Sequence, residues 1–420
     1  MPGNHDLAVP SMTMTRARRT IGATALVLVA SLILTAAPPA AALSAQRAKP
    51  KWVARIQEVV GDHPMSVAIG DDGTWWFRHQ AFVRRPPASN EKLLLSMALF
   101  DHVDPSRRIP TKVTTAARRQ GGTIEGNVWV IGRGDPELRG RQMGALARGI
   151  VEAGIRRIRG SVRGATTPFV RDWWATGWRD YFPLLYIARP TALVFNGNRD
   201  RRGRHVGDPE RRAAAALTAK LRSLGVRVVG DPGSGAPPSG TRTLAAITSA
   251  PMRAIVRRMN VTSRNFTAEV LGKYLGARVT GRGSIPGGAE AIRRFAAARG
   301  VSIEAYDGSG LSYANRISAL GTVQLLWDAE GRPWGGVLRA SLPTGGQGTL
   351  KDRLAGVRVR AKTGSLERVS ALSGWIWLER EGGWVGFSIM SSGMSTTTAK
   401  QIENQIVRVV SANASDPHVG

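Results

Sequence analysis

The chain of 420 residues is long enough for two or three compact domains, and its hydrophobic fraction of 42% is that of a globular protein rather than a disordered one. It has no cysteine, which excludes a disulfide scaffold, a cysteine-based zinc site and a cysteine nucleophile. The formal net charge is +29, but the arginines are scattered and no nucleic-acid-binding motif is present, so we predict no nucleic-acid partner.

The first segment of the chain has the order of a secretory signal peptide. Arginines precede an apolar run over residues 21–37, two prolines end that run, and residues 40–42 form a small-residue cleavage site. The run is short for a membrane span, which needs roughly 20 apolar residues, so we favour cleavage over a retained anchor. The sequence therefore predicts a signal peptide over residues 1–42 and an extracytoplasmic protein in the cell wall, the periplasm or the medium. Its positive charge would attract it to anionic wall polymers there.

Hydrophobic periodicity predicts the first elements of the remaining chain. We expect an amphipathic helix over residues 52–60 and a hairpin whose strands are residues 66–70 and 74–77. A second helix begins near Ser89.

Between about residues 103 and 250 the pattern changes. We expect a strand over residues 126–132, helices over residues 145–153 and 212–224, and a linker in the Gly/Pro/Ser-rich residues 230–240. This stretch is interpreted as an inserted domain or a pair of subdomains.

Helical patterns dominate again from residue 250 to about residue 339. Three strand-like runs follow, over residues 357–366, 371–380 and 384–390, and a glycine-containing turn joins the last two as an antiparallel hairpin. Ser395 is a candidate cap for a final amphipathic helix.

Three short motifs carry the chemistry of the sequence. They have the patterns S-x-x-K, S-x-N and K-T-G and occur in this order: Ser89 with Lys92, Ser263 with Asn265, and Lys362-Thr363-Gly364. The first two patterns arise easily by chance, whereas only about 0.07 K-T-G matches are expected in a chain of this composition. The ordered set is therefore a specific signal of a serine acyltransferase site.

The spacing of the first motif has a physical reason. Residues three apart share one face of a helix, so Lys92 can approach the Ser89 hydroxyl. A lysine acts as a base towards a serine when burial and a neighbouring cation lower its pKa, and Lys362 is a candidate for that cation. On a strand, the small Gly364 would let a substrate backbone come close.

At these motifs the chain resembles the S13 family of serine D-Ala-D-Ala peptidases, the class C low-molecular-mass penicillin-binding proteins. The resemblance runs from about residue 50 to residue 410 and includes the segments around each motif and two glycine-rich turns: residues 87–93, 132–136, 307–312, 348–354 and 360–366. It implies an α/β (α+β) fold, in which a β-lactamase/transpeptidase-like domain with an antiparallel sheet flanked by helices is interrupted by an insertion. The expected division is a transpeptidase-like domain in two parts, residues 43–102 and 251–420, around inserted residues 103–250.

The resemblance also implies a mechanism that needs no cofactor and no metal. Ser89 is expected to be the acylated nucleophile, with Lys92 as its general base. Ser263 is expected to pass a proton to the leaving D-alanine, and the backbone N–H groups of Ser89 and Ser365 are expected to form the oxyanion hole.

The remaining motif residues are expected to bind the substrate. Asn265 would hold a substrate amide, while Lys362 and Thr363 would bind the terminal carboxylate beside Gly364 and Ser365. The implied partners are peptidoglycan stem peptides, with β-lactams as covalent inhibitors because they mimic the D-Ala-D-Ala dipeptide.

Several alternatives stay open at this point. A β-lactamase or esterase on the same fold differs only in its deacylation rate, and a catalytically idle wall-binding protein is a further alternative. The middle residue of S-x-N is Arg264, where a small or acidic residue is commoner. We expect residues 307–312 to be a structural turn and Trp173 and Trp174 to be buried. The six dispersed histidines give no support for a metal site.

Overall fold

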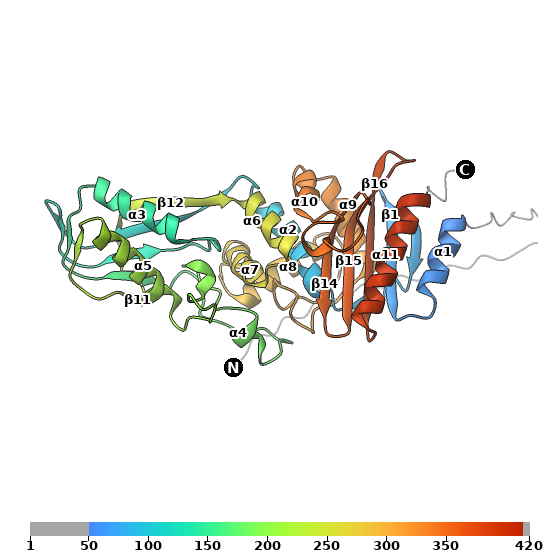
Figure 1. Cartoon of the computed structure of the whole chain (residues 1–420), viewed down its shortest axis with the longest axis horizontal. Coiled ribbons are helices and arrows are strands. Elements are labelled where there is room, and N and C mark those ends of the chain that lie inside the picture. The colour runs from blue at the N-terminus through green and yellow to red at the C-terminus, as the bar shows by residue number, and fades with distance from the viewer. Residues whose placement is uncertain (1–49, 415–420) are drawn as a thin grey trace, which may run out of the picture. The chain divides into compact units, whose positions relative to one another are not determined.

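The computed structural model describes residues 50–414 (Figure 1). The predicted signal peptide, residues 1–42, lies outside the described residues, as do residues 43–49 and 415–420. Within the described part of the chain, no helix is both long enough and apolar enough to cross a membrane.

Helices and strands are distributed unevenly along the chain. The α-helices are α1 (Lys51–Val60), α2 (Glu91–His102), α3 (Gly140–Glu152), α4 (Phe182–Leu185), α5 (Pro209–Ser223), α6 (Met252–Thr262), α7 (Asn265–Val279), α8 (Ile285–Ala297), α9 (Ala319–Glu330), α10 (Gly335–Ser341) and α11 (Thr396–Asn413). The short 3-10 helices are η1 (Ala88–Asn90), η2 (Asn196–Asn198) and η3 (Gly348–Leu350). The strands are β1 (Met65–Asp71), β2 (Thr74–His79), β3 (Arg84–Arg85), β4 (Arg108–Thr115), β5 (Arg119–Gln120), β6 (Thr123–Ile124), β7 (Val128–Ile131), β8 (Arg157–Ile158), β9 (Val162–Ala165), β10 (Arg227–Val228), β11 (Gly233–Gly235), β12 (Arg242–Pro251), β13 (Ile317–Ser318), β14 (Val359–Leu366), β15 (Val369–Leu378) and β16 (Gly383–Ser392).

A five-stranded antiparallel sheet joins the two ends of the described chain. Its strand order is β14-β15-β16-β1-β2. β1 pairs with β16, with Val67 opposite Ile389, so the first hairpin is added to the edge of the last three strands. The turn between β1 and β2 contains Asp72 and Gly73, whose φ angles of 41° and 81° suit aspartate and glycine.

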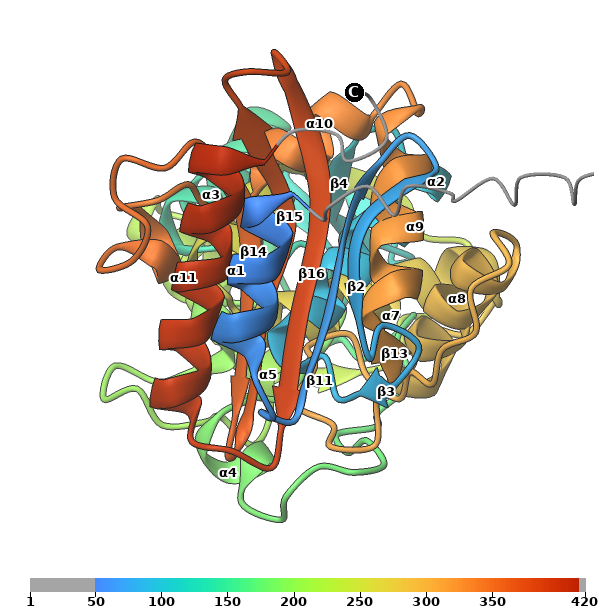
Figure 2. The same cartoon turned by 90° about the vertical axis from the view of Figure 1, so that its right-hand side faces the viewer.

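Helices cover both faces of this sheet (Figure 2). On one face, α1 and α11 pack against the strands in a hydrophobic core that includes Ile56, Phe387 and Ile406. On the other face, α2 and α6 to α10 form a second core, which includes Leu94, Leu271 and Leu326. Every residue of α2 from Glu91 to Phe100 is buried, so the start of this helix is fixed on all sides by packing.

Residues 108–251 form two further sheets with a separate hydrophobic core. The larger sheet has the order β11-β9-β7-β4-β12, and the smaller one has the order β10-β8-β6-β5. α3 and α5 pack against these strands, and the core includes Val113 and Leu217. β12 runs antiparallel to β4, with Pro251 opposite Arg108, so the chain enters and leaves this region at neighbouring positions.

The predicted helix over residues 52–60, the first hairpin and the last three strands are all present. The predicted linker over residues 230–240 was wrong in part, because β11 lies within it and pairs in parallel with β9. Ser395 does precede α11, but its side chain makes no capping hydrogen bond. α5 begins earlier than predicted because Asp208 caps it by accepting the backbone N–H of Arg211.

Candidate active site

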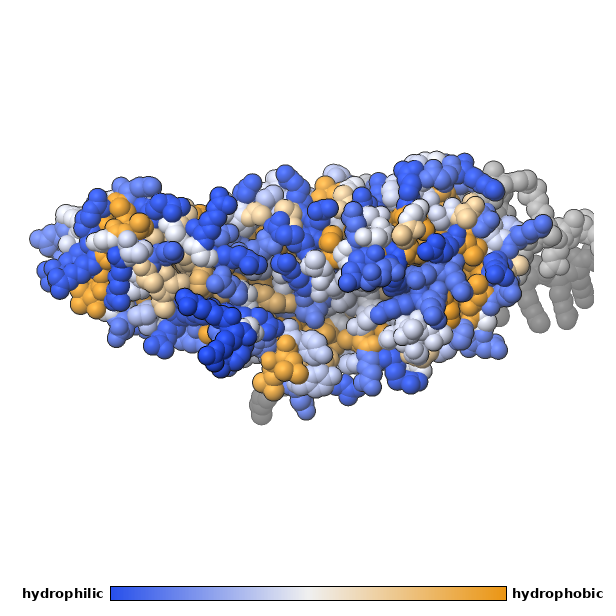
Figure 3. Space-filling view, viewed as in Figure 1, coloured by the Kyte–Doolittle hydropathy of each residue, from blue (hydrophilic) through white to orange (hydrophobic). Residues whose placement is uncertain are grey.

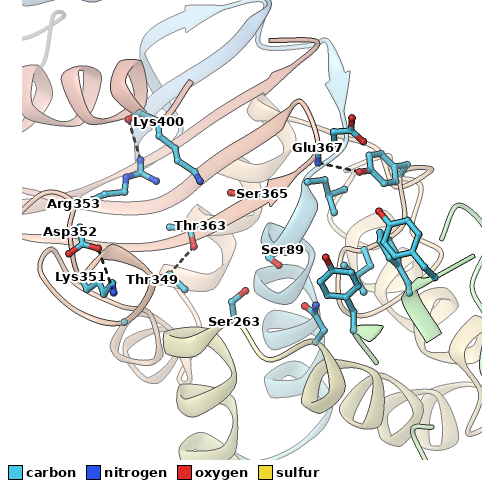
Figure 4. Close-up of a pocket in the computed structure, with 18 residues that line it drawn as sticks. Ser89, Ser263, Thr349, Lys351, Asp352, Arg353, Thr363, Ser365, Glu367 and Lys400 are labelled. Carbon is cyan, nitrogen blue, oxygen red and sulfur yellow. Dashed lines mark hydrogen bonds and ion pairs between the residues drawn. The ribbon is translucent and has the colours of Figure 1, made fainter. Parts of the chain in front are cut away.

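The three predicted motifs meet at one cleft of about 670 Å3 (Figure 4). Hydroxyl and amide groups from each motif line it: Ser89, Ser263, Asn265, Thr363 and Ser365. The two lysines of the motifs lie beneath this lining with fully buried side chains, and each forms a hydrogen bond with one of the lining serines. The structure therefore brings together every side chain that the sequence predicts for the site.

Close backbone packing positions Ser89. The preceding residue, Ala88, has a φ of 48°, a left-handed conformation that non-glycine residues rarely adopt. A Cβ on Gly310 would lie 1.8 Å from the carbonyl oxygen of Ala88, and a Cβ on Gly364 would lie 2.6 Å from that of Pro87. Both positions require glycine, and together they hold Ser89 in η1, directly before α2.

The amine of Lys92 has three hydrogen-bond partners. Its Nζ lies 2.9 Å from Ser89 Oγ and 2.8 Å from Asn265 Oδ1, and it also contacts the carbonyl oxygen of Ser309. The two carbonyl oxygens can only accept hydrogen bonds. When the amine is neutral, it donates to those two oxygens, and its lone pair is left to face the Ser89 hydroxyl.

Burial sets the protonation of Lys92. Desolvation lowers the pKa of this amine from its usual value to about 8, while Asp307, Glu269 and Glu91 oppose the shift. A lysine with a pKa of about 8 is neutral in an appreciable fraction of molecules near neutral pH, as a base needs to be. Burial therefore dominates the shift, whereas the motifs also predicted a contribution from a second cation, Lys362.

Lys362 and Ser263 form the second hydrogen-bonded pair of the cleft. Lys362 Nζ donates to Ser263 Oγ at 3.0 Å and to the backbone carbonyl oxygen of Thr363 at 2.8 Å. Ser263 has the left-handed φ of 52° at the end of α6, which turns its side chain into the cleft. Burial, followed by the charge of Lys92, holds the pKa of the Lys362 amine well below its usual value. Thr363 Oγ1 lies 2.8 Å from Thr349 Oγ1 at the cleft wall.

A buried carboxylate network supports Lys92 from below. Glu269 Oε1 accepts the backbone N–H groups of Gly308 at 3.1 Å and Ser309 at 2.7 Å. Burial, and then the charge of Asp307, raises the pKa of Glu269 to about 8. No sequence motif marked Glu269. Its position one helical turn after Asn265 was the available signal, because residues four apart on a helix share a face.

The predicted structural turn at residues 307–312 is confirmed. Asp307 accepts the backbone N–H groups of Gly310 at 2.9 Å and Ser312 at 3.0 Å. It also accepts the indole N–H of Trp178 at 2.7 Å, which ties this turn to a segment about 130 residues earlier in the chain. No sequence pattern marked that contact.

The cleft has an aromatic wall and a basic wall that the motifs did not predict. The aromatic wall comes from α4 and its neighbours and comprises Tyr181, Phe182 and Tyr186. The basic wall includes Lys351 and Arg353, and Figure 4 places both on the far side of Thr363 from Glu367. Leu184 and Leu185 of α4 are exposed, and Figure 3 shows several hydrophobic groups on an otherwise mostly hydrophilic face. Substrate side chains therefore meet different surfaces on the two sides of the cleft.

Two residues that the sequence left open are placed clearly. Arg264 is exposed, donates to Thr262 Oγ1 at 3.1 Å and lines a neighbouring hollow rather than the Ser89 cleft. The predicted burial was wrong for both tryptophans, since Trp174 is 45% exposed and Trp173 is only half-buried. Trp173 lies beneath cationic groups, including Lys273 at 4.8 Å from its ring. Among residues 50–414, no group of acidic and histidine side chains is arranged to hold a metal ion.

Known proteins resemble this chain over most of its length. The D-alanyl-D-alanine carboxypeptidase of Actinomadura sp. (strain R39) is 27% identical over 413 residues, which cover 76% of each chain. A carboxypeptidase of Mycobacterium tuberculosis is 27% identical over 344 residues, covering 73% of this chain and 71% of its own.

The fold has a close counterpart among solved structures. Penicillin-binding protein 4 from Haemophilus influenzae superposes with a TM-score of 0.76 at 19% identity, covering 86% of this chain and 99% of its own. The two proteins therefore share a fold. Residues 64–201 and 192–413 match the D-Ala-D-Ala carboxypeptidase 3 (S13) family, and the chain belongs to that family.

Proposed function

We propose that the protein is a serine-type D-Ala-D-Ala carboxypeptidase or endopeptidase that acts on peptidoglycan stem peptides through an acyl-enzyme on Ser89. One observation carries the proposal: Lys92 Nζ lies 2.9 Å from Ser89 Oγ, and its other partners are carbonyl oxygens. Membership of the family and the two carboxypeptidase relatives support the same activity.

Acylation begins with the Ser89 hydroxyl. Its proton moves to the neutral amine of Lys92 while Oγ attacks the carbonyl carbon of the penultimate D-alanine. The developing oxyanion is stabilised by the backbone N–H groups of Ser89 and Ser365, both of which line the cleft. Collapse of this intermediate breaks the peptide bond. Ser263 passes its proton to the leaving amine and receives in its place the proton held by Lys92, so Lys92 is neutral again.

The terminal carboxylate of the substrate binds at Lys362 and Thr363. The side chain of Lys362 is fully buried and no carboxylate of the described residues forms an ion pair with it. A bound carboxylate would supply that missing charge and raise the pKa of the Lys362 amine. Asn265 uses its Oδ1 to accept from Lys92, so its amide N–H groups are free to donate to a substrate carbonyl.

Hydrolysis of the ester on Ser89 completes the reaction: Lys92 takes a proton from the attacking water and returns it to Ser89 Oγ as the ester bond breaks. If the leaving group is free D-alanine, the enzyme acts as a carboxypeptidase. If the leaving group is a cross-linked stem peptide, it acts as an endopeptidase. β-Lactams follow the same acylation route and leave an ester that hydrolyses slowly.

Two features outside the cleft complete the proposal. Residues 1–42 act as a signal peptide that exports the protein, as their charged, apolar and small-residue order supports. Residues 103–250 form a domain inserted between the two parts of the transpeptidase-like domain, residues 43–102 and 251–420. The separate core of this region and the neighbouring ends of β4 and β12 support that division.

The test is intact-protein mass spectrometry of the mature protein with benzylpenicillin, beside Ser89→Ala and the matched control Ser106→Ala on an exposed loop. We expect a stable adduct on the wild type and the control and none on Ser89→Ala. Release of D-alanine from a D-Ala-D-Ala peptide should follow the same pattern. No adduct with intact antibiotic would overturn the acylation mechanism, and no adduct with rapid loss of antibiotic would identify a β-lactamase instead.

A further inference from the structure

A second hollow, of about 610 Å3, lies on the open face of the larger sheet formed by residues 108–251. The strand registers define that face. Lys112 pairs opposite Ile131, and Thr114 pairs opposite Thr243, so these four side chains point to the same side of the sheet. Val113, between them, points to the opposite side, where α3 and α5 cover the sheet. The hollow shares no lining residue with the Ser89 cleft.

The charged groups around this hollow are all cationic. It is lined by Arg107, Lys112, Arg133 and Arg278 and by no aspartate or glutamate. All four side chains are exposed, and none of them forms an ion pair within residues 50–414. Cations that share a hollow without a carboxylate repel one another, and a bound anion removes that repulsion.

A second arginine-rich hollow on the same region is built differently. Its lining contains Arg204 and Arg211 but also Asp200 and Asp208. Asp200 forms an ion pair with Arg204 at 2.8 Å, and Asp208 accepts the backbone N–H of Arg211. The high arginine content of the chain therefore does not by itself leave cations unpaired, and the hollow at Lys112 is distinct in this respect.

The uncharged lining indicates which anion would fit. The accessible hydroxyl-bearing side chains Thr241 and Thr243 line the hollow beside the apolar surfaces of Pro110 and Ile131. Hydroxyl groups and apolar patches suit a polyol or sugar unit, while the cations suit the negative charge of an anion attached to it.

The aromatic rings of the hollow argue against a nucleic-acid strand. Phe169 and Tyr274 are 5% and 6% exposed, and the guanidinium of Arg278 lies 4.6 Å from the centre of the Tyr274 ring. Single-stranded nucleic acids gain much of their affinity by stacking bases on exposed rings, and these rings offer no such platform.

We propose that this hollow binds an anionic polymer of the cell wall, a phosphodiester-linked polyol or sugar chain. Its phosphates contact Lys112, Arg133, Arg278 and Arg107, and its polyol units lie against the threonine hydroxyls. Binding there leaves the Ser89 cleft open, so the enzyme would be held at the wall while it cleaves stem peptides. The binding site is independent of the proposed peptidase activity and is measured without it.

The test is calorimetric titration of the mature protein with a synthetic poly(glycerol phosphate) chain at about 0.15 M salt. The variant Lys112→Gln/Arg133→Gln/Arg278→Gln should bind at least about tenfold more weakly than the wild type, because each lost phosphate contact reduces counterion release. All three residues lie outside the Ser89 cleft, so acylation by benzylpenicillin should keep its wild-type rate and report correct folding.

The matched control removes the same charge elsewhere. Arg118→Gln/Arg141→Gln/Arg257→Gln alters three exposed arginines that do not line the hollow, and it should change the affinity by less than about threefold. Equal losses in both variants would overturn the proposal in favour of diffuse attraction to the net charge. No binding of the polymer by the wild type would overturn it outright. Tighter binding of a thymidine oligonucleotide of equal charge, lost in the first variant, would replace the wall polymer by nucleic acid.

Discussion

Glu269 accepts the backbone N–H of Ser309 at 2.7 Å, and the carbonyl oxygen of the same Ser309 accepts a hydrogen bond from Lys92. Since the two contacts involve the peptide groups on either side of one residue, the buried carboxylate fixes the position of the oxygen that orients the Lys92 amine. Glu269 touches neither Ser89 nor the cleft, so it acts as a positioning residue.

The first prediction concerns the variant Glu269→Gln. Glutamine keeps an oxygen for the N–H of Ser309 but removes the negative charge that Glu269, with a pKa of about 8, carries in part over the pH range in which Lys92 titrates. That charge raises the pKa of Lys92. The pKa of Lys92 should therefore fall, and the rise of the acylation rate with pH should move to lower pH. Stopped-flow acylation by a chromogenic β-lactam across the pH range measures this, with Glu58→Gln on α1 as an exposed control. A lower rate with an unmoved pH profile would show that Glu269 is structural only.

The second prediction is the pH profile of the wild type. Lys92 is active as a base only when neutral, and its pKa is about 8. The acylation rate should therefore rise about tenfold per pH unit below that value and level off above it.

Lys92→Arg tests the assignment of this profile. Arginine keeps the charge but stays protonated, so acylation should fall by about 10² to 10⁴ and the rise near pH 8 should vanish. The matched control is Lys220→Arg on the exposed side of α5, which should behave as the wild type. A rise near pH 8 that persists in Lys92→Arg would assign it to a different group.

The sequence predicted the members of the site better than their surroundings. Ser89 and Lys92 are neighbours because helical spacing dictates it, so their 2.9 Å contact follows from the motif. Asn265 contacts Lys92 although the two residues are 173 positions apart in the sequence. Only the order of the motifs indicated that they would meet. The partner oxygen on Ser309 belongs to the backbone, whose position no residue type encodes. Sequence reasoning therefore predicted the side chains that meet at the cleft and missed the groups that orient them.

The same distinction holds for the fold. Strand-like runs predicted β14, β15 and β16, whose pairing is local. The pairing of β1 with β16 joins distant parts of the chain, and periodicity carries no information about it. Strands of two residues, such as β8 and β10, are too short to show alternation, and β11 lies among glycines that resemble a linker.

The third prediction concerns carboxylate recognition by Thr363. Thr363→Val keeps the side-chain shape but removes the hydroxyl group that we assign to the substrate carboxylate. KM for a D-Ala-D-Ala peptide should rise about tenfold, as expected for a hydrogen bond to a charged group. A peptide with a C-terminal amide serves as the control, because the variant and the wild type should process it with similar KM values. An equal loss with both peptides would mean that the hydroxyl group acts through Thr349 rather than on the carboxylate.

The fourth prediction concerns the contact between Trp178 and Asp307. Trp178→Phe removes the indole N–H and leaves a buried carboxylate with one donor fewer, so the free energy of unfolding should fall by about 2 kcal/mol. Acylation by benzylpenicillin should also slow, because Asp307 holds the turn that contains Ser309. Urea unfolding with the neighbouring, exposed Trp174→Phe as control checks this, and that control should cost less than about 0.5 kcal/mol. Similar losses in both variants would assign the effect to aromatic packing.

The fifth prediction compares two glycines with nearly the same backbone conformation. Gly310 and Gly300 have φ angles of 77° and 71°, so an alanine at either position pays a similar conformational cost of about 1 kcal/mol. They differ in their surroundings: a Cβ on Gly310 would lie 1.8 Å from the carbonyl oxygen of Ala88, whereas a Cβ on Gly300 would meet no atom within 4 Å.

Gly310→Ala must therefore displace the backbone directly before Ser89, and it should lower the unfolding free energy by about 3 kcal/mol or more and abolish acylation by benzylpenicillin. Gly300→Ala should lower the unfolding free energy only by the conformational cost, and it should be acylated at the wild-type rate. Urea unfolding and intact-protein mass spectrometry on the two variants separate these contributions. Normal acylation by a stably folded Gly310→Ala would contradict the role given to this close approach, because the position of Ser89 would then not depend on it.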